Sequence, residues 1–540
     1  MERHWATIFE SISDAIPDRP ALTNGTVTRT WREYDDRAAR FAAALVRAGL
    51  GPDSKVALYL YNGNEYLEAQ YGAFKMRGVP VNVNYRYLDD ELWYLLDNAD
   101  AEALVFHSSL SERVGRVAGR LPKLKLLTEV DDGGPSLGTA AAPWEQLLHG
   151  HHPMERIARS EDDVYMLYTG GTTGMPKGVM YQMANFVQHF MRRELASLDL
   201  PESEDPADLA PIAATLHARG TAPVTTTAAP LMHGTGLWLG VMMHQLVGAH
   251  VVTLTKRRFD AADLLRVIEQ HRCTHVAIVG DAFAKPIIRA LDEADEHGRP
   301  FDTSSLRRMY SSGTMWTAEV KQALLDRMPQ LVMYDSMGAS EGSVGAQITS
   351  RSSPPATARF ELPPTSKVFR DDFTEVVPGS DEVGMVAIGA GMVPTGYYKD
   401  PEKSARTFPI IDGVRYSMPG DLAQVAADGT LILLGRGSQV INSGGEKIYP
   451  EEVEEAVKRV EGVVDCLVVG IDDERFGQAV TAVAALAPHA TPTEAQVIAA
   501  VKEQLASYKA PKHVVFVDEI PRAPNGKADY KAAKRLATGA

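Results

Sequence analysis

Cysteine is scarce in this sequence of 540 residues, which contains only Cys273 and Cys466. The two are far apart, and each stands in an apolar context, so we expect small buried core residues in a reducing compartment. Clustered ligands with metal-binding spacing are also missing, which excludes a structural zinc site.

Long hydrophobic runs are absent as well. No stretch of 18 or more apolar residues occurs, so no membrane-spanning helix is predicted. The N-terminus has no continuous apolar segment of the kind that a secretory signal requires. These absences predict a cytoplasmic protein.

Basic residues are outnumbered, with 55 Lys and Arg against 70 Asp and Glu, and the net charge is −15. This balance argues against nucleic acid as a partner. Hydrophobic residues at 45% and charged residues at 23% are ordinary for a soluble enzyme. The length exceeds that of one hydrophobic core, so two or more domains are expected.

One glycine- and threonine-rich run, residues 168–178, dominates what is present. It follows the apolar segment 164–167, which predicts a strand leading into a loop. Glycines allow backbone N–H groups to point inward around an anion, and the threonine hydroxyls and Lys177 add further donors. The run is not a Walker A loop, because Pro176 precedes the lysine and Gly178 follows it. A flexible surface loop is the ordinary alternative, but the composition favours a polyphosphate site.

This run resembles the phosphate loop of the adenylate-forming superfamily, which contains acyl-CoA synthetases, luciferases and the adenylation domains of peptide synthetases. The resemblance implies that ATP or AMP is bound by the loop residues Thr169, Gly170, Gly171, Thr172, Thr173, Gly174 and Lys177.

Helices and strands are predicted to alternate through the first part of the chain, which is typical of an α/β fold. Helices are expected over residues 31–50, 66–76 and 261–271, and strands over residues 56–60, 103–106 and 250–254. Asn24-Gly25 predicts a tight hairpin. Residues 130–160 and 200–230 are interpreted as two surface excursions.

His233 follows an apolar segment and precedes two glycines, Gly234 and Gly236. A lone histidine is usually structural. In the resembling acyl-CoA synthetases, however, a His-Gly in this context adjoins the acyl pocket, and we interpret the glycines as leaving room for a bulky acid. The predicted acyl pocket comprises His233, Gly234, Gly236, Leu237 and Asp281.

A carboxylate at Glu341 ends the segment 335–342, where the family pattern has aromatic-Gly-x-Thr-Glu. The resemblance implies that Glu341 holds Mg²⁺, which commonly uses one carboxylate together with substrate phosphates. An exposed surface glutamate is the alternative. Met337 replaces the usual aromatic residue, and Ser340 replaces threonine. The residues implied to surround the nucleotide are Ser312, Gly313, Met337, Gly338 and Ser340.

Asp421 follows a glycine turn, and Arg436 comes fifteen residues later. The resemblance implies contacts from both to ribose or phosphate. It also places a hinge at Ser438, where the family usually has Asp or Lys. We therefore predict an N-terminal adenylation domain over residues 1–435 and a small, mobile α+β domain over residues 436–540.

The predicted C-terminal domain carries two further motifs. Ser443, Gly444 and Gly445 resemble the loop that lines the pantetheine tunnel of acyl-CoA synthetases, which implies CoA binding. Lys527 closes the motif Pro-x4-Gly-Lys, which matches the catalytic lysine of the superfamily.

Together the motifs predict an AMP-forming acyl-CoA synthetase, a ligase of lipid metabolism with Mg²⁺ as cofactor and ATP, CoA and a carboxylic acid as substrates. Lys527, His233 and Glu341 are the predicted catalytic residues. Several segments resemble the actinobacterial branch that includes steroid side-chain CoA ligases, which favours a medium- or long-chain fatty acid or a steroid side-chain acid.

Other functions remain open from the sequence. They are an aryl or short-chain acid–CoA ligase, an adenylating enzyme that loads a carrier protein, a luciferase-like oxygenase and a non-catalytic acyl-nucleotide binding protein. The oligomeric state is also open, a homodimer included.

Overall fold

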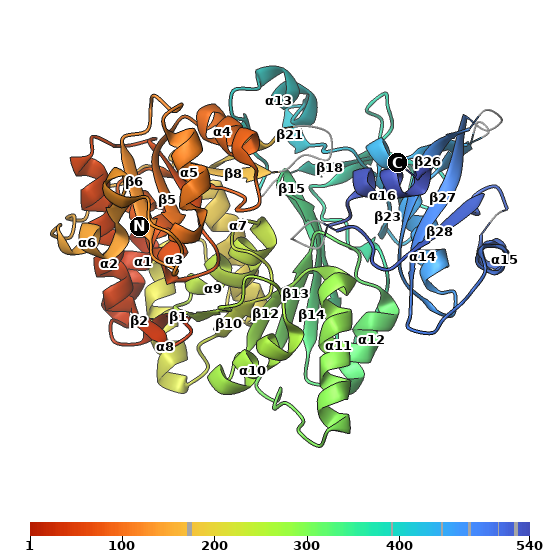
Figure 1. Cartoon of the computed structure of the whole chain (residues 1–540), viewed down its shortest axis with the longest axis horizontal. Coiled ribbons are helices and arrows are strands. Elements are labelled where there is room, and N and C mark those ends of the chain that lie inside the picture. Colours follow the sequence, from red (N-terminus) through yellow and green to blue (C-terminus); the bar gives the residue numbers. More distant parts are fainter. Residues whose placement is uncertain are drawn as a thin grey trace. The chain divides into compact units, whose positions relative to one another are not determined.

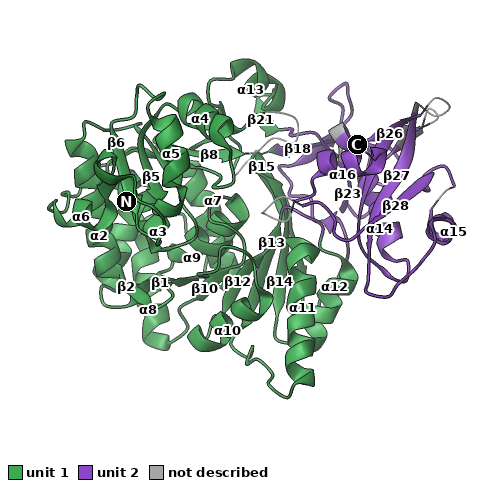
Figure 2. Ribbon diagram, in the orientation of Figure 1, with its two compact units in different colours: residues 1–312, 316–355, 389–417 green, residues 313–315, 356–388, 418–540 purple. Residues whose placement is uncertain are grey.

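The computed structural model describes residues 1–169, 175–389, 392–443, 446–473, 477–505, 507–522 and 527–539. The chain forms two compact units (Figure 2). The first comprises residues 1–312, 316–355 and 389–417, and the second residues 313–315, 356–388 and 418–540. The predicted boundary between residues 435 and 436 concerns a hinge for movement, and it stays a prediction.

The first unit is an α/β structure, and its described residues form three sheets and a short hairpin. The largest has eight strands, in the order β15 (Gly342–Thr349), β14 (Val332–Ala339), β13 (Arg308–Ser312), β12 (His275–Ile278), β10 (Val224–Thr227), β11 (His250–Thr253), β1 (Pro20–Asn24) and β2 (Val27–Thr30). Its inner strands are parallel, and the edge strands β2 and β15 are antiparallel to their neighbours.

A second, parallel sheet has the order β4 (Val79–Asn82), β3 (Lys55–Tyr59), β5 (Ala101–His107), β6 (Leu126–Val130) and β7 (Ala142–Pro143). The third is antiparallel, with the order β19 (Gly396–Tyr397), β9 (Lys177–Gln182) and β8 (Val164–Thr169). A short hairpin pairs β20 (Ile410–Ile411) with β21 (Val414–Ser417).

Helices connect and cover these strands (Figure 1). They are α1 (Trp5–Ala15), α2 (Trp31–Arg47), α3 (Asn64–Lys75), α4 (Asp89–Asn98), α5 (Ser111–Ala118), α6 (Trp144–His149), α7 (Met183–Ser197), α8 (Leu209–Arg219), α9 (Met243–Gln245), α10 (Ala261–His271), α11 (Gly280–Glu296), α12 (Ala318–Arg327) and α13 (Pro401–Thr407). A π-helix over Thr235–Met242 precedes α9.

The second unit has two sheets. In the first, β16 (Arg359–Phe360) pairs with β23 (Leu431–Arg436), β23 with β22 (Asp421–Val425), β22 with β18 (Gly384–Gly389), and β18 with β17 (Lys367–Phe369). The second has the order β25 (Glu446–Ile448), β24 (Ile441–Ser443), β27 (Gly477–Leu486) and β26 (Val463–Asp473), with β28 (His513–Val517) beside β27. Its helices are α14 (Pro450–Lys458), α15 (Glu494–Gln504) and α16 (Tyr530–Thr538).

Hydrophobic periodicity accounts for much of this arrangement. Ile8 and Ile12 of α1 are fully buried on one helical face, as their spacing predicts. The predicted helix over residues 261–271 coincides with α10, and the Asn24-Gly25 hairpin joins β1 to β2. The predicted α/β fold is confirmed. Both cysteines are buried free thiols, and in the part of the chain that the structure describes no helix is long and apolar enough to cross a membrane.

The predicted excursion over residues 200–230 is wrong. It contains helix α8 and strand β10, which lies in the interior of the eight-stranded sheet. Thr225, Thr226 and Thr227 are fully buried in β10, since β-branched side chains pack well in strands. The excursion over residues 130–160 is likewise partly ordered, because it includes β7 and α6, whose Trp144 and Leu148 are buried.

Candidate functional site

The glycine-rich run connects two antiparallel strands. Strand β8 ends at Thr169 and β9 begins at Lys177, and these two residues are register partners. Gly170, Gly171, Thr172, Thr173 and Gly174 lie outside the described residues. The run is thus followed by a strand and not by the helix of a Walker A motif, which the sequence also excludes.

Asn82, at the end of β4, ties the base of this hairpin to the segment before His233. Its side-chain amide donates to the carbonyl oxygens of Tyr168 (2.8 Å) and Met232 (2.7 Å), and its Oδ1 accepts from the Tyr168 amide at 2.7 Å. The side chain is buried with all these groups satisfied, which stabilises the arrangement. The candidate phosphate loop and the candidate acyl-pocket histidine are therefore held on one framework.

Glu341 lies in the tight turn between β14 and β15, in which Ala339 pairs with Gly342. Its Oε1 accepts a hydrogen bond of 2.9 Å from the Tyr397 hydroxyl on β19. Tyr397 in turn pairs with Val179 of β9, two residues beyond Lys177. The structure thus brings the predicted metal ligand and the predicted phosphate loop together through one tyrosine.

Lys177 forms an ion pair with Asp400, and its ammonium lies 5.7 Å from the centre of the Tyr397 ring. Lys403 lies against the same ring at 5.2 Å. The hydrogen bond from Lys177 lowers the pKa of the Asp400 carboxyl, while burial and then the charge of Lys177 lower the pKa of Lys403. The result is a group of two cations and two carboxylates around one ring.

The sequence motifs predict no role for Tyr397, Asp400 or Lys403. The run Gly396 to Pro401, which contains Tyr397 and Asp400 but not Lys403, resembles a loop and turn of the superfamily. No local pattern predicts that it pairs with β9, because Lys177 and Asp400 are 223 positions apart.

The remaining predicted nucleotide residues lie at strand ends. Ser312 ends β13, and Met337 and Gly338 lie near the end of β14, where a bulge interrupts the pairing with β15. A Cβ at Gly338 would lie 3.0 Å from the Gly342 carbonyl oxygen, so the glycine permits the close pairing. Ser340 shares the turn with Glu341, and Gly313 has a positive φ of 94°.

Asp281, which is predicted to line the acyl pocket, binds Thr317, the residue at the start of helix α12. Its carboxylate accepts hydrogen bonds from the Thr317 amide at 2.9 Å and from the Thr317 hydroxyl at 3.0 Å, just before α12. Its contribution to an acyl pocket stays a prediction.

The glycines after His233 allow close packing. A Cβ on Gly236 would lie 2.3 Å from the Pro230 carbonyl oxygen, and one on Gly234 would lie 3.0 Å from the Trp238 ring. Leu237 is buried in the same core. Its backbone amide donates a hydrogen bond of 2.9 Å to the backbone carbonyl oxygen of half-buried His233. The space beside Gly236 is filled by the protein itself, so this glycine gives no support for room for a bulky acid.

Gly236→Ala is therefore expected to destabilise the first unit by about 2 kcal/mol, because the added methyl group must displace backbone. The measurement is the urea midpoint of unfolding. Gly119→Ala is the control, since a Cβ there meets nothing within 4 Å. A variant with unchanged midpoint but a raised KM for large acids would restore the sequence interpretation.

In the second unit, Asp421 begins β22 and is the register partner of Arg436 at the end of β23. The two predicted ribose-binding positions, fifteen residues apart, are thus adjacent across two strands. Gly435 before the arginine has a φ of 112°, and a Cβ there would collide with the Glu451 carboxylate. Ser438 lies in a 3-10 turn over Gly437–Gln439. The described structure does not include the side chains of Arg436 and Ser438.

Ser443 ends β24 with a buried side chain, and β24 pairs with β25 around Gly444 and Gly445, which are outside the described residues. Lys527 is exposed. An antiparallel β-bridge pairs Arg522 with Ala528, the residue that follows Lys527. The guanidinium of Arg522 binds Asp465 of β26 at 2.7 Å, which anchors this segment to the sheet.

The donor set at Glu341 suits Mg²⁺. Among the residues that the structure describes, no group of three or more His, Cys, Asp or Glu side chains could hold a metal ion. A single carboxylate instead fits a cation that takes most of its ligands from substrate phosphates and water.

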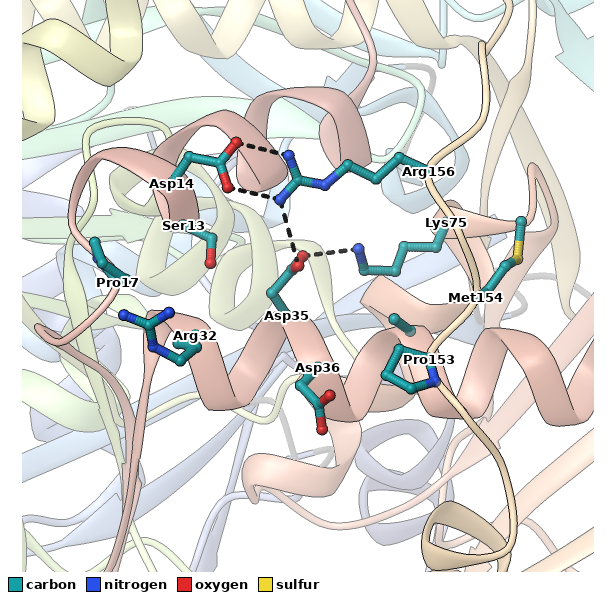
Figure 3. A pocket seen from close by; sticks show the side chains of 11 residues that line it. Ser13, Asp14, Pro17, Arg32, Asp35, Asp36, Lys75, Pro153, Met154 and Arg156 are labelled. Atoms are coloured by element: carbon teal, nitrogen blue, oxygen red, sulfur yellow. Dashed lines mark hydrogen bonds and ion pairs between the residues drawn. The ribbon is translucent and has the colours of Figure 1, made fainter.

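A cavity of about 360 Å³ lies elsewhere in the first unit, between α1, α2, α3 and residues 153–156 (Figure 3). The predicted site residues do not line it. Arg156 pairs with Asp14 at 2.6 Å, and Lys75 pairs with Asp35 at 2.7 Å and with Glu10 at 2.8 Å. The charged groups that line the cavity thus have ion-pair partners, some within the lining and some beyond it, which points to a structural role.

Lys75→Met is expected to destabilise the first unit by about 3 kcal/mol, because the Lys75 side chain is 3% exposed and loss of its ammonium leaves buried carboxylates without one cation. The urea midpoint measures the effect. Lys256→Met removes an exposed i,i+4 pair with Asp260 and should change stability by less than about 0.5 kcal/mol. Equal midpoints for the two variants would contradict this assignment.

Comparison with known proteins decides the family. The model of the family described as "AMP-binding enzyme" matches residues 9–398, and that of the "AMP-binding enzyme C-terminal domain" matches residues 452–527. The chain belongs to the AMP-binding enzyme family. The predicted membership of the adenylate-forming superfamily is thereby confirmed.

Relatives of this AMP-binding enzyme are named CoA ligases. The 3-oxocholest-4-en-26-oate–CoA ligase of Rhodococcus rhodochrous is 38% identical, over 99% of this chain and 96% of its own. The medium-chain acyl-CoA ligase Mig of Mycobacterium avium is 39% identical, over 98% and 97%. The crystal structure of the anthranilate CoA ligase AuaEII in complex with anthranoyl-AMP has a TM-score of 0.84 at 22% identity, covering 99% of this chain and 98% of that one, which shows the shared fold.

Proposed function

We propose that this AMP-binding enzyme is an acyl-CoA synthetase, which converts a carboxylic acid, ATP and CoA into acyl-CoA, AMP and diphosphate. The observation that carries the proposal is the identity of 38–39% with two named CoA ligases along nearly the whole chain. The cluster around Tyr397 supports it, because Lys177 and Lys403 lie against the ring whose hydroxyl binds Glu341, and such cations would suit phosphate oxygens.

In the first half-reaction, the substrate carboxylate attacks the α-phosphorus of ATP, and the bond to the β-phosphate oxygen breaks. The substrate supplies the nucleophile, so the protein contributes positioning and charge stabilisation. Lys527 neutralises the charge that develops between the carboxylate and the α-phosphate. Loop 169–177 binds the departing pyrophosphate.

The other predicted residues orient the substrates. Asp421 and Arg436 bind the ribose or the phosphate, and His233 adjoins the reacting carboxylate. The nucleotide is held by Ser312, Gly313, Met337, Gly338 and Ser340. Glu341 would hold Mg²⁺, which when bound offsets phosphate charge.

In the second half-reaction, the CoA thiol releases its proton to solvent and its sulfur attacks the acyl carbon, the acyl–phosphate bond breaks, and AMP leaves with its electron pair. We place a mobile domain at residues 436–540, which turns about Ser438, withdraws Lys527, and brings Ser443, Gly444 and Gly445 to the pantetheine. Hinge residues need only absorb a change in φ and ψ, so serine can serve.

We further propose that the acid is a medium- or long-chain fatty acid or a steroid side-chain acid. The support comes from the names of the relatives, one of which specifies a 3-oxo steroid acid and the other medium-chain acids. Gly236 lends this proposal no support, because its space is filled.

The test is AMP release from ATP and Mg²⁺ with acetate, octanoate, palmitate, an aryl acid and a steroid side-chain acid, each with CoA or with a carrier protein. We expect CoA-dependent release with octanoate, palmitate or the steroid acid. Strict preference for acetate or the aryl acid would overturn the acid proposal, and release that requires a carrier protein would overturn the CoA ligase.

Cytoplasmic location belongs to the same proposal, since ATP and CoA are cytoplasmic substrates and the two buried thiols suit a reducing compartment.

The oligomeric state is a separate question. Light scattering of the same preparation tests whether two copies associate.

A further inference from the structure

We infer that Lys403 is a second phosphate-binding residue, which acts beside Lys177 on the pyrophosphate that leaves in the proposed reaction. The inference rests on the proposed function for the identity of the ligand. It assigns a role to a residue for which no motif of the sequence predicts one.

The two ammonium groups share one aromatic ring. Lys177 lies 5.7 Å and Lys403 5.2 Å from the centre of the Tyr397 ring, and the hydroxyl of that ring binds Glu341 at 2.9 Å. Lys403 therefore lies beside both predicted partners of the phosphates, the lysine of the loop and the carboxylate for Mg²⁺.

The neighbouring carboxylates are already engaged. Oδ2 of Asp400 pairs with Lys177, and its Oδ1 accepts a hydrogen bond of 3.1 Å from the Lys403 backbone amide. Oε1 of Glu341 accepts from Tyr397. Among the residues that the structure describes, the Lys403 ammonium has no ion pair of its own. A half-buried ammonium has three donors to satisfy, and phosphate oxygens are suitable acceptors.

The backbone fixes Lys403 at this place. Strand β19 pairs with β9, so the chain that leads to α13 runs beside the base of the glycine-rich hairpin. Ser404 Oγ accepts from the Tyr397 amide at 2.8 Å and donates to the Asp400 carbonyl at 2.6 Å. These bonds link β19 to the first turn of α13 and so fix the backbone that carries Lys403.

A purely structural role for Lys403 is the competing explanation, since a cation over an aromatic ring can stabilise the packing of Tyr397. The two roles differ in what they predict for the binding of inorganic pyrophosphate. A structural lysine affects stability alone, whereas a phosphate ligand affects the Kd of pyrophosphate.

The experiment is titration calorimetry of the full-length protein with inorganic pyrophosphate and Mg²⁺, for the wild type, Lys403→Met, Lys403→Gln and Lys403→Arg. We expect Met and Gln to weaken binding by about 10-fold, as for the loss of a charge-assisted hydrogen bond. Arginine keeps the charge and should stay within about 3-fold of the wild type. The KM for ATP should follow the same order.

Lys399→Met is the matched control. Lys399 lies four residues earlier, and its ammonium pairs with Asp100 at 2.7 Å. Its pyrophosphate Kd should equal that of the wild type. Unchanged pyrophosphate binding in folded Lys403→Met or Lys403→Gln would overturn the inference, as would equal weakening by Lys399→Met. A wild type that forms no AMP with any acid would overturn the proposed function instead, and the pyrophosphate series would still test Lys403.

Discussion

Lys527→Ala is expected to slow formation of the acyl-adenylate by about 10³-fold, the scale on which one preorganised charge-stabilising donor contributes. The thiolation of a supplied acyl-adenylate should stay within about 3-fold of the wild type. The reason is that the ammonium offsets negative charge while carboxylate and α-phosphate approach, and thioester formation from the finished adenylate involves no such encounter. ATP–pyrophosphate exchange measures the first half-reaction, and acyl-CoA formed from synthetic acyl-adenylate measures the second.

The surroundings of Lys527 make this experiment specific. The residue is exposed, at the end of a loop closed by the bridge between Arg522 and Ala528, so loss of its side chain should leave the fold intact. Lys534→Ala is the control, because Lys534 lies on α16 of the same unit with a loose pair to Asp472 at 3.9 Å. Its two half-reactions should both match the wild type. Equal loss of both half-reactions in Lys527→Ala would show that the lysine has no separate role in adenylation.

Local sequence patterns predict the fold where a single hydrophobic period dominates a segment. The bounds of α10 follow from its apolar spacing and its Asp260 N-cap, whose carboxylate accepts from the Asp263 amide. The composition around strand β10 predicts a surface excursion instead, because threonines are common in loops. In the fold the hydroxyl of Thr225 donates to the Gly240 carbonyl at 2.9 Å, and that of Thr227 to the Ala229 carbonyl at 3.1 Å. Such partners depend on tertiary structure, so composition could not predict the burial.

The candidate site likewise contains some residues that local sequence patterns can predict and others that only the tertiary structure reveals. Thr169, Lys177 and Glu341 belong to compact motifs and could be found from the sequence. Asn82 and Tyr397 could not, because each acts by joining segments that are distant along the chain. Gly236 shows that a motif residue can also mislead. The sequence reveals that a side chain is missing there, but not which atoms fill the space.

Glu341→Gln is expected to lower the rate of adenylation by about 10³-fold, which is comparable to the loss of several kcal/mol of charge stabilisation from a bound metal ion. Glutamine has nearly the same shape, and its side-chain oxygen can still accept from the Tyr397 hydroxyl, which lies 2.9 Å from Oε1 in the wild type. The turn between β14 and β15 should therefore persist, and only the negative charge is lost. The dependence of the rate on Mg²⁺ concentration should shift to higher concentrations.

Two further variants separate the charge of Glu341 from its position. Tyr397→Phe removes the hydrogen bond but keeps the carboxylate, so a smaller loss of about 10-fold is expected. Glu402→Gln changes the net charge by the same amount at an exposed position of α13, and it should leave the rate and the Mg²⁺ dependence unchanged. If Glu341→Gln retained the wild-type Mg²⁺ dependence, the metal would have to be held by other residues, and the glutamate would serve the turn alone.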